Sequence, residues 1–190
     1  MVNVIITSLF LGVGLAMDAT AVSMANGMNE PCMKLKKVTL VAFMFGLFQG
    51  LMPFIGYLAG SVILGKIEWL IPWVALVLLS FIGVKMLIEG IKNEDSSCEE
   101  GKRLTFKVLV IQAIATSIDA LSVGFTISNY SLLEATVASL IIALVTFVIC
   151  IFAVYIGKKF GTKFGNKAEI LGGIILVVIG IEIFVTGLIK

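Results

Sequence analysis

The sequence predicts an all-α integral membrane protein with six transmembrane helices, arranged as two inverted three-helix repeats. Three observations lead to this prediction. Apolar residues make up 59% of the 190 residues and charged residues only 14%, whereas a soluble domain carries about 25% charged residues. The apolar residues fall into six stretches, each long enough to cross a ~30 Å hydrocarbon core. Finally, short motifs of the first half recur in the second half.

The six predicted spans follow one another with little sequence between them. They occupy residues 3–28, 38–64, 69–91, 106–129, 132–157 and 170–189. The most charged interruption is the segment NEDSSCEEG, which is typical of a solvated linker. After the fifth span, Gly157, Gly161 and Gly165 in GKKFGTKFG suggest a flexible basic loop or an interfacial turn. We therefore expect a first three-helix repeat over residues 1–91, a charged cytoplasmic linker over residues 92–105 and a second three-helix repeat over residues 106–190.

The basic residues are distributed unevenly between the two sides of these spans. Eleven of the 14 fall in or beside the loops after the first, third and fifth stretches, against two on the other side. Because cytoplasmic loops carry an excess of Lys and Arg, both termini are expected outside. The expected location is the bacterial plasma membrane, with the lipid bilayer as surroundings. The net charge of +2 gives no reason to expect a nucleic-acid partner.

The composition also excludes several kinds of chemistry. The chain has no His, so it has neither a Ser-His-Asp nor a Cys-His catalytic system, and no imidazole metal ligand. Its three cysteines, Cys32, Cys98 and Cys150, are far apart and form no CxxC pair. They suggest neither a disulfide framework nor a thiolate zinc site. We do not expect an enzyme.

Two motif pairs indicate the internal repeat. Met17-Asp18-Ala19 recurs as Ile118-Asp119-Ala120 after 101 positions, and Gly83 and Gly90 recur as Gly180 and Gly187 after 97 positions. A repeat with an odd number of helices places its second copy upside down in the membrane. Secondary transporters are built in this way, with their sites near the midplane at the repeat interface.

Asp18 and Asp119 are the leading candidates for function. Each lies within a few residues of the centre of its predicted span, where an aspartate costs about 2.5–3.5 kcal/mol on insertion scales. Helical rise places them a few Å on either side of the midplane, so the two can approach one another. Two close carboxylates repel unless they are protonated or bridged by a cation. The alternative is a hydrogen bond across a helix interface.

Polar neighbours make these carboxylates a candidate metal site. On the fourth predicted span they form a stripe at three- and four-residue steps, consisting of Gln112, Thr116, Asp119, Ser122 and Thr126. Asn26 lies two turns beyond Asp18, and Gln49 could add its amide oxygen, although its glycine-rich helix is also typical of a packing seam. Oxygen ligands of this kind suit Mg, Ca or Mn better than Zn or Cu. The predicted metal ligands are Asp18, Asp119, Gln49, Asn26, Ser122 and Thr116.

Lys85 and Glu182 are candidates for an accessory charge or a proton carrier. They occupy equivalent repeat positions with opposite charge. Helical rise separates their depths by about 12 Å, which is too far for a direct bond. Lys85 has a possible partner in Glu89 at i+4, or extends to the interface. Glu182 has no local partner and could be a third carboxylate.

The motifs that contain these residues resemble the manganese efflux pump family MntP, within the lysine-exporter-like superfamily. They are GLAMDA around Asp18, FGLFQGLMP around Gln49, ATSIDA around Asp119 and KAEILGG at residues 167–173. The resemblance covers essentially the whole chain. It implies export of Mn²⁺ from the cytoplasm, with Mn²⁺ as the substrate and no resident cofactor, and it implies leading roles for Asp18 and Asp119. Relatives can carry an acid at position 49 and Arg at position 85, where this chain has Gln49 and Lys85.

We therefore expect a secondary transporter that exports Mn(II) through a midplane carboxylate site. Carboxylates that release a metal ion can take up protons, so proton exchange is the candidate energy source. The alternatives are export of another divalent cation, an organic cation or an amino acid. A membrane protein that binds a partner without transporting anything is a further class, and an intramembrane aspartyl protease is the least favoured.

Overall fold

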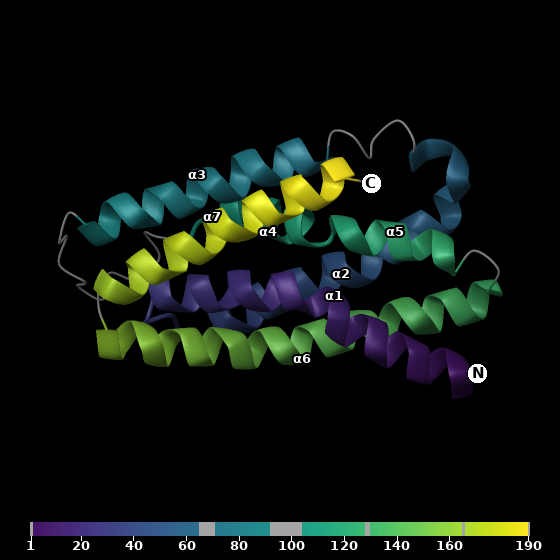
Figure 1. The fold of residues 1–190 in the computed structure, drawn as a ribbon. Coiled ribbons are helices and arrows are strands. Elements are labelled where there is room, and N and C mark those ends of the chain that lie inside the picture. Colours follow the sequence, from purple (N-terminus) through teal and green to yellow (C-terminus); the bar gives the residue numbers. More distant parts are fainter. Residues whose placement is uncertain (1, 65–70, 92–103, 128–129, 165, 190) are drawn as a thin grey trace.

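The computed structural model describes residues 2–64, 71–91, 104–127, 130–164 and 166–189, and these residues contain helices and no strands. The helices lie alongside one another in an elongated bundle (Figure 1). Their bounds are α1 (Val2–Asn29), α2 (Leu35–Leu64), α3 (Ile71–Ile91), α4 (Phe106–Thr116), α5 (Ile118–Thr126), α6 (Leu132–Phe164) and α7 (Asn166–Ile189).

Three of the helices are long and apolar enough to cross a membrane, namely Val2–Asn29, Leu35–Leu58 and Leu132–Lys163. A fourth span results if the bent pair α4 and α5 is counted as one. In α7 the apolar part that qualifies is shorter, Ile170–Glu182. Many large apolar side chains, such as Phe10, Phe81 and Phe152, are exposed on the outside of the bundle, as expected of helices that face lipid. The chain is thus a helical membrane protein, and the count of six spans stays a prediction.

The fourth predicted span differs most from expectation. It was expected to be one helix over residues 106–129, but α4 and α5 meet at Ser117 with a bend of 41°. Figure 1 shows this break about midway along the bundle. The expected continuous polar stripe is therefore divided, with Gln112 and Thr116 on α4 and Asp119 and Ser122 on α5.

The fifth predicted span is longer than expected. It was expected to end at Gly157, with a flexible basic loop after it, whereas α6 continues to Phe164. The reason is that its glycines are packing sites against α1. A Cβ added to Gly157 would lie closer than 3.0 Å to the carbonyl of Met24, and one added to Gly161 would meet the carbonyl of Met28 at 2.7 Å. Small residues allow such close approach of helix backbones.

The close contact between α1 and α6 depends on Gly27 as well. A Cβ at Gly27 would lie closer than 3.0 Å to the carbonyl of Val154 and to the backbone nitrogen of Lys158, and it would lie 3.1 Å from the Cα of Gly157. These contacts involve backbone atoms, which cannot move aside as the end of a flexible side chain can. The two helices can therefore cross at this distance only with glycine at these positions.

A second crossing, between α2 and α5, has the same contacts. A Cβ at Gly124 would collide with the carbonyl of Pro53, the backbone nitrogen of Tyr57 and the Cα of Gly56. A Cβ at Gly56 would collide with the carbonyl of Leu121. Gly124 follows Gly27 by 97 positions, and Gly157 follows Gly56 by 101. The contacts of Gly27, and that of Gly157 with Met24, each have a counterpart here at the same offsets.

Two further helix pairs complete the packing. Gly83 on α3 faces Gly173 and Val177 on α7, and Gly180 on α7 faces Leu76 and Ser80 on α3, again related by 97 positions. Between the two crossings, α2 and α6 meet where Gly46 and Gly50 approach Ala143. The close contacts of α2 with α6 thus connect the helix pair α1 and α6 to the helix pair α2 and α5.

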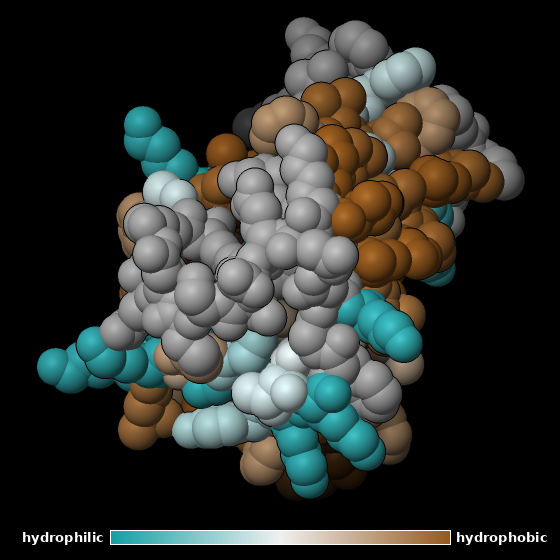
Figure 2. Space-filling view, turned by 90° about the vertical axis from the view of Figure 1, so that its left-hand side faces the viewer, coloured by the Kyte–Doolittle hydropathy of each residue, from teal (hydrophilic) through white to brown (hydrophobic). Residues whose placement is uncertain are grey.

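The two ends of the bundle differ in charge. The N-terminus lies at one end, and the α1–α2 connection lies at the other, with the end of α6 and the start of α7 beside it (Figure 1). Figure 2 faces the latter end, where hydrophilic side chains project around the edge. The lysines of these segments that are at least partly exposed are Lys34, Lys36, Lys37, Lys158, Lys159, Lys163 and Lys167. We call this the basic end.

The described cysteines have different states. Cys150 is free and buried on α6, which agrees with a packing role. Cys32, in the α1–α2 connection, is disulfide-bonded. The spacing of the cysteines did not suggest this bond.

Candidate functional site

The break between α4 and α5 is formed by local hydrogen bonds of Ser117. Its hydroxyl donates to the carbonyls of Ala113 at 2.7 Å and Ile114 at 3.1 Å, and its backbone N–H donates to Ile114 at 3.1 Å. Such back-bonding by Ser competes with the regular helical ladder and bends helices. Ser117 is fully buried, so the bend is part of the packed interior.

Asp119 lies in the first turn of α5, directly after the break. The backbone N–H of Ala120 donates to Asp119 Oδ1 at 2.8 Å, whereas in a continuous helix it would donate to the carbonyl of Thr116. A carboxylate is favourable at a helix N-terminus because of the helix dipole and the unpaired N–H groups. Asp119 is an exposed residue of the described bundle, although neighbouring atoms bury much of its carboxylate.

Asp18 and Glu182 complete a group of three interacting carboxylates. Asp18 on α1 is half-buried and lies close enough to Asp119 for their charges to repel. Glu182 on α7 acts on Asp18 in the same way and is exposed. In the described part of the chain, no group of three or more Cys, Asp or Glu side chains is arranged to hold a metal ion. The three carboxylates therefore do not form one metal-binding cluster in this structure.

Gln49 connects α2 to this group. It is fully buried, its Nε2 donates to the carbonyl of Leu15 on α1 at 3.1 Å, and its amide also interacts with the Asp119 carboxylate. Its Oε1 has no hydrogen-bond partner among the described residues. A buried oxygen without a partner is costly, and such groups in native proteins call for an explanation such as a ligand or water.

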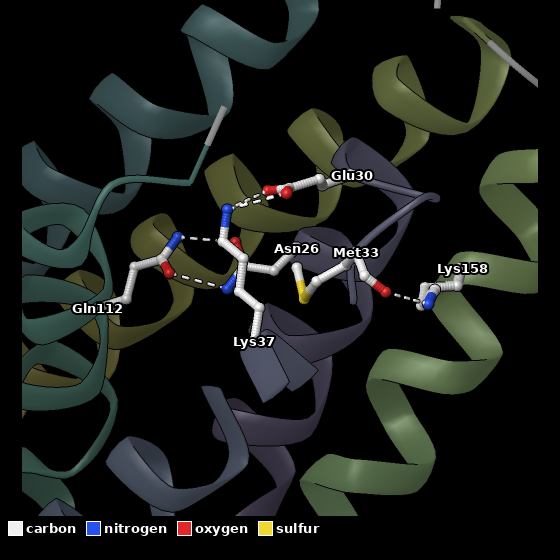
Figure 3. Close-up of polar contacts among 6 residues, drawn as sticks. All are labelled: Asn26, Glu30, Met33, Lys37, Gln112 and Lys158. Atoms are coloured by element: carbon white, nitrogen blue, oxygen red, sulfur yellow. Dashed lines mark hydrogen bonds and ion pairs between the residues drawn. The ribbon is translucent and has the colours of Figure 1, made fainter. Parts of the chain in front are cut away.

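Asn26 and Gln112 lie elsewhere and pair with each other. Asn26 Nδ2 donates to Gln112 Oε1 at 2.8 Å, and Gln112 Nε2 donates to Asn26 Oδ1 at 3.2 Å (Figure 3). Both side chains are buried. The structure therefore gives the amide of Asn26, a predicted metal ligand, a partner on α4 in place of the carboxylates.

The remaining predicted residues have various surroundings. Thr116 is buried, and its hydroxyl donates to the carbonyl of Gln112 at 3.0 Å. Ser122 is partly buried on α5, one turn after Asp119. Lys85 and Glu89 belong to α3, and Thr126 ends α5, but the side chains of all three lie outside the described residues, as do residues 92–103 of the predicted linker over residues 92–105.

Two features near the basic end were not anticipated from the sequence. Lys37 donates to both carboxylate oxygens of Glu30, at 2.9 and 2.6 Å, and Glu30 is only 4% exposed. Lys158 on α6 donates to the carbonyl of Met33. Figure 3 shows these contacts beside the amide pair of Asn26 and Gln112. A Glu placed directly after an apolar helix, with Lys seven residues later, was the available signal for the ion pair.

The comparisons with known proteins agree on one family. A family model described as "Putative manganese efflux pump" matches residues 32–184. A protein of Ruminiclostridium cellulolyticum, named "Putative manganese efflux pump MntP", is 43% identical over 178 residues, which cover 93% of each chain. A protein of the same name from Campylobacter fetus is 40% identical over 184 residues, covering 96% of this chain and 98% of its own. No solved structure matches the chain.

Proposed function

The chain belongs to the MntP family of manganese efflux pumps, and on that basis we propose that it carries Mn²⁺ out of the cell through a site between Asp18 and Asp119. The observation that carries the proposed site is the helix break. At this break the Asp119 carboxylate lies near the carboxylate of Asp18 and near the amide of Gln49, whose buried oxygen has no partner among the described residues.

The ligand chemistry supports a hard divalent cation. Asp18, Asp119 and Gln49 offer oxygen atoms, and Mn²⁺ accepts carboxylate and carbonyl oxygens. A dication between Asp18 and Asp119 also removes their mutual repulsion. The few side-chain ligands suit a carried ion, because transport needs binding strong enough for entry and weak enough for release. Mn²⁺ is thus the substrate of this site.

Two inverted repeats are the proposed architecture. Residues 1–91 form the first and residues 106–190 the second, joined by the linker over residues 92–105, with six spans in all. The matched crossings of α1 with α6 and of α2 with α5 support this arrangement, since their contacts recur at offsets of 97 and 101 positions. In transporters of this design the substrate site lies at the interface of the repeats, on discontinuous helices. The α4–α5 break has that character.

The proposed orientation places the basic end in the cytoplasm and both termini outside. Lysines of the α1–α2 connection and of the α6–α7 junction gather at this end. The positive-inside rule assigns such an end to the cytoplasmic side. Export then runs from the basic end towards the end that holds the N-terminus.

Proton exchange is the proposed energy source, and Glu182 is the candidate proton carrier. Its charge acts on Asp18, and carboxylates that release a metal ion can take up protons in its place. Lys85 remains a candidate accessory charge on α3. Efflux from vesicles should respond to an imposed pH gradient, and Mn²⁺ efflux that is indifferent to the gradient would contradict the exchange.

Cellular manganese content tests the proposed function. The host is a bacterium without a manganese exporter, kept under manganese load, and the variants are Asp18→Asn and Asp119→Asn at matched membrane expression. The wild type is expected to lower cell manganese, and both variants are expected to leave it high. If the wild type reaches the membrane and leaves manganese unchanged, manganese is not the substrate.

A further inference from the structure

The close helix contacts divide the core into two bodies. One consists of α1 and α6, which cross at Gly27 and Gly157, and the other of α2 and α5, which cross at Gly124 and Gly56. They meet along α2 and α6, around Ala143. Backbone lies against backbone at each crossing and also where Gly46 and Gly50 of α2 meet α6, so a movement that preserves all of these contacts is a turn of one pair against the other about the α2–α6 contact. The contacts that join one body to the other are then the ones that change when the bodies move.

At the basic end two polar links join these bodies. The amide pair connects Asn26 of α1 with Gln112 of α4, the helix continued by α5. The ion pair connects Glu30, at the end of α1, with Lys37 in the first turns of α2. Asn26, Gln112 and Glu30 are each no more than 4% exposed, whereas the Lys37 side chain is 22% exposed, so the amide pair is fully buried and the ion pair lies at the edge of the packed interior.

Lys158 attaches the α1–α2 connection to the first body, which consists of α1 and α6. It extends from α6 to the carbonyl of Met33, and Figure 3 shows it on the opposite side of Met33 from Lys37. The connection is therefore attached to α6. The Glu30–Lys37 ion pair lies on the other side of it, at the boundary with α2.

The two links lie between the proposed site and the basic end. Asn26 follows Asp18 by eight residues, and Gln112 precedes Asp119 by seven, which is about 10–12 Å along each helix. Glu30 lies one turn beyond Asn26, and its N–H donates to the carbonyl of Asn26 at 3.1 Å. Both links therefore lie nearer to the basic end than the two carboxylates do.

The sequence offers no such links at the repeat-related positions of the opposite end. The offsets of 97 and 101 positions pair Asn26 with Val123, Glu30 with Ile127 and Lys37 with Ala138, and they pair Gln112 with Leu15 or Leu11. These counterparts are apolar side chains, which can form neither an amide pair nor an ion pair. The two polar links are therefore a feature of the basic end that the repeat does not duplicate.

We propose that the Asn26–Gln112 amide pair and the Glu30–Lys37 ion pair are two layers of a gate at the basic end, and that both separate when the Asp18–Asp119 site opens to that end. This rests on the proposed transport function. Amides and charged groups suit such a gate, because on separation each finds hydrogen bonds to water. The gate can therefore open without leaving buried polar groups unpaired.

Thiol labelling tests the gate directly. A reporter is introduced as Thr116→Cys, at a buried position one turn from Gln112 on the side of Asp119. The background carries Cys32→Ser, Cys98→Ser and Cys150→Ala. A membrane-impermeant thiol reagent is applied to vesicles of both orientations, so that each end of the protein meets it in turn.

The gate predicts that Lys37→Gln and, separately, Asn26→Leu raise the labelling rate from the basic end at least fivefold. The double variant Glu30→Lys with Lys37→Glu restores an ion pair of opposite sense and should return the rate to within twofold of the reporter alone. Lys36→Gln removes an exposed lysine next to Lys37 and should leave the rate unchanged.

Three results would overturn the gate. These are an unchanged rate in Lys37→Gln and Asn26→Leu, an increase from the opposite end only, and a charge-swapped variant that labels as fast as Lys37→Gln. The last result separates loss of the ion pair from general loosening of the fold. Because labelling requires no manganese, a failure of manganese export would leave this result interpretable.

Discussion

The Asp119 carboxylate takes part in two interactions. Its carboxylate accepts a hydrogen bond from the N–H of Ala120 at the start of α5, and it faces a second carboxylate, Asp18, across the helix boundary. A cation between the two carboxylates would offset the repulsion between their charges.

Substitutions of Gln49 test whether its side chain binds the ion or only packs between the helices. Gln49→Met keeps the length of the side chain and removes the unpartnered Oε1. If this oxygen binds Mn²⁺, the variant should bind about tenfold more weakly, equivalent to ~1.4 kcal/mol. Equilibrium binding of Mn²⁺ to the purified protein in detergent measures this. Gln49→Glu, which supplies an oxygen and a charge, should bind at least as tightly as the wild type, and weak binding in both would argue for a packing role.

Among the elements, the broken α4–α5 pair has a local cause that can be removed. Ser117→Ala eliminates the hydroxyl bonds to Ala113 and Ile114, so the helix is expected to straighten and displace Asp119. Mn²⁺ efflux should fall at least tenfold while the protein still reaches the membrane. Ser8→Ala is the control, because Ser8 makes the same i−4 bond to Val4 within the unbroken α1. Equal efflux in the two variants would show that the break does not position the site.

The helix crossings make a second prediction at this scale. Gly27→Ala and Gly124→Ala place a Cβ against backbone atoms of α6 and α2, respectively, and overpacking of this kind costs about 1–3 kcal/mol. The thermal midpoint in detergent should fall in both variants. Gly14→Ala provides the comparison, since nothing lies within 4 Å of the added Cβ, and it should match the wild type. A midpoint unchanged in Gly27→Ala would contradict the crossing.

For the whole molecule, composition and periodicity predicted much of the fold. Long apolar runs identify helices such as α1 and α2 because burial in lipid requires them. The break at Ser117 was not predicted from the sequence, because Thr and Ser are common inside membrane helices and a bend becomes evident only from the hydrogen bonds that they make. The extension of α6 to Phe164 was not predicted, because Gly157 and Gly161 were interpreted as parts of a flexible loop or turn. In the structure they pack closely against the backbone of α1.

The candidate site was predictable in part for the same reason. Asp18, Asp119 and Glu182 stand out because acids inside apolar runs are rare, and the structure brings their charges within range of one another. The pairing of Asn26 with Gln112 was not anticipated, because spacing along one helix does not tell which neighbouring helix a polar side chain meets. Their mutual pairing depends on how α1 meets α4.

Orientation gives a prediction for the molecule as a whole. An alkaline phosphatase fused to the C-terminus should be active, because that enzyme folds only outside the cytoplasm and the proposed topology places the C-terminus there. A fusion within the α1–α2 connection, after Lys34, should be inactive. The reverse pattern would place the basic end outside and would reverse the direction of transport along the proposed path.

The most direct test of the central claim is Mn²⁺ flux through the purified protein in sealed liposomes. The claim is that Asp18 and Asp119 together carry the ion. The wild type is predicted to move Mn²⁺ down an imposed gradient, and Asp18→Asn and Asp119→Asn are each predicted to reduce flux to the level of empty liposomes. Thr20→Ala, two residues from Asp18 with a hydroxyl bonded within its own helix, should retain flux. Wild-type flux that persists in both aspartate variants would contradict the account.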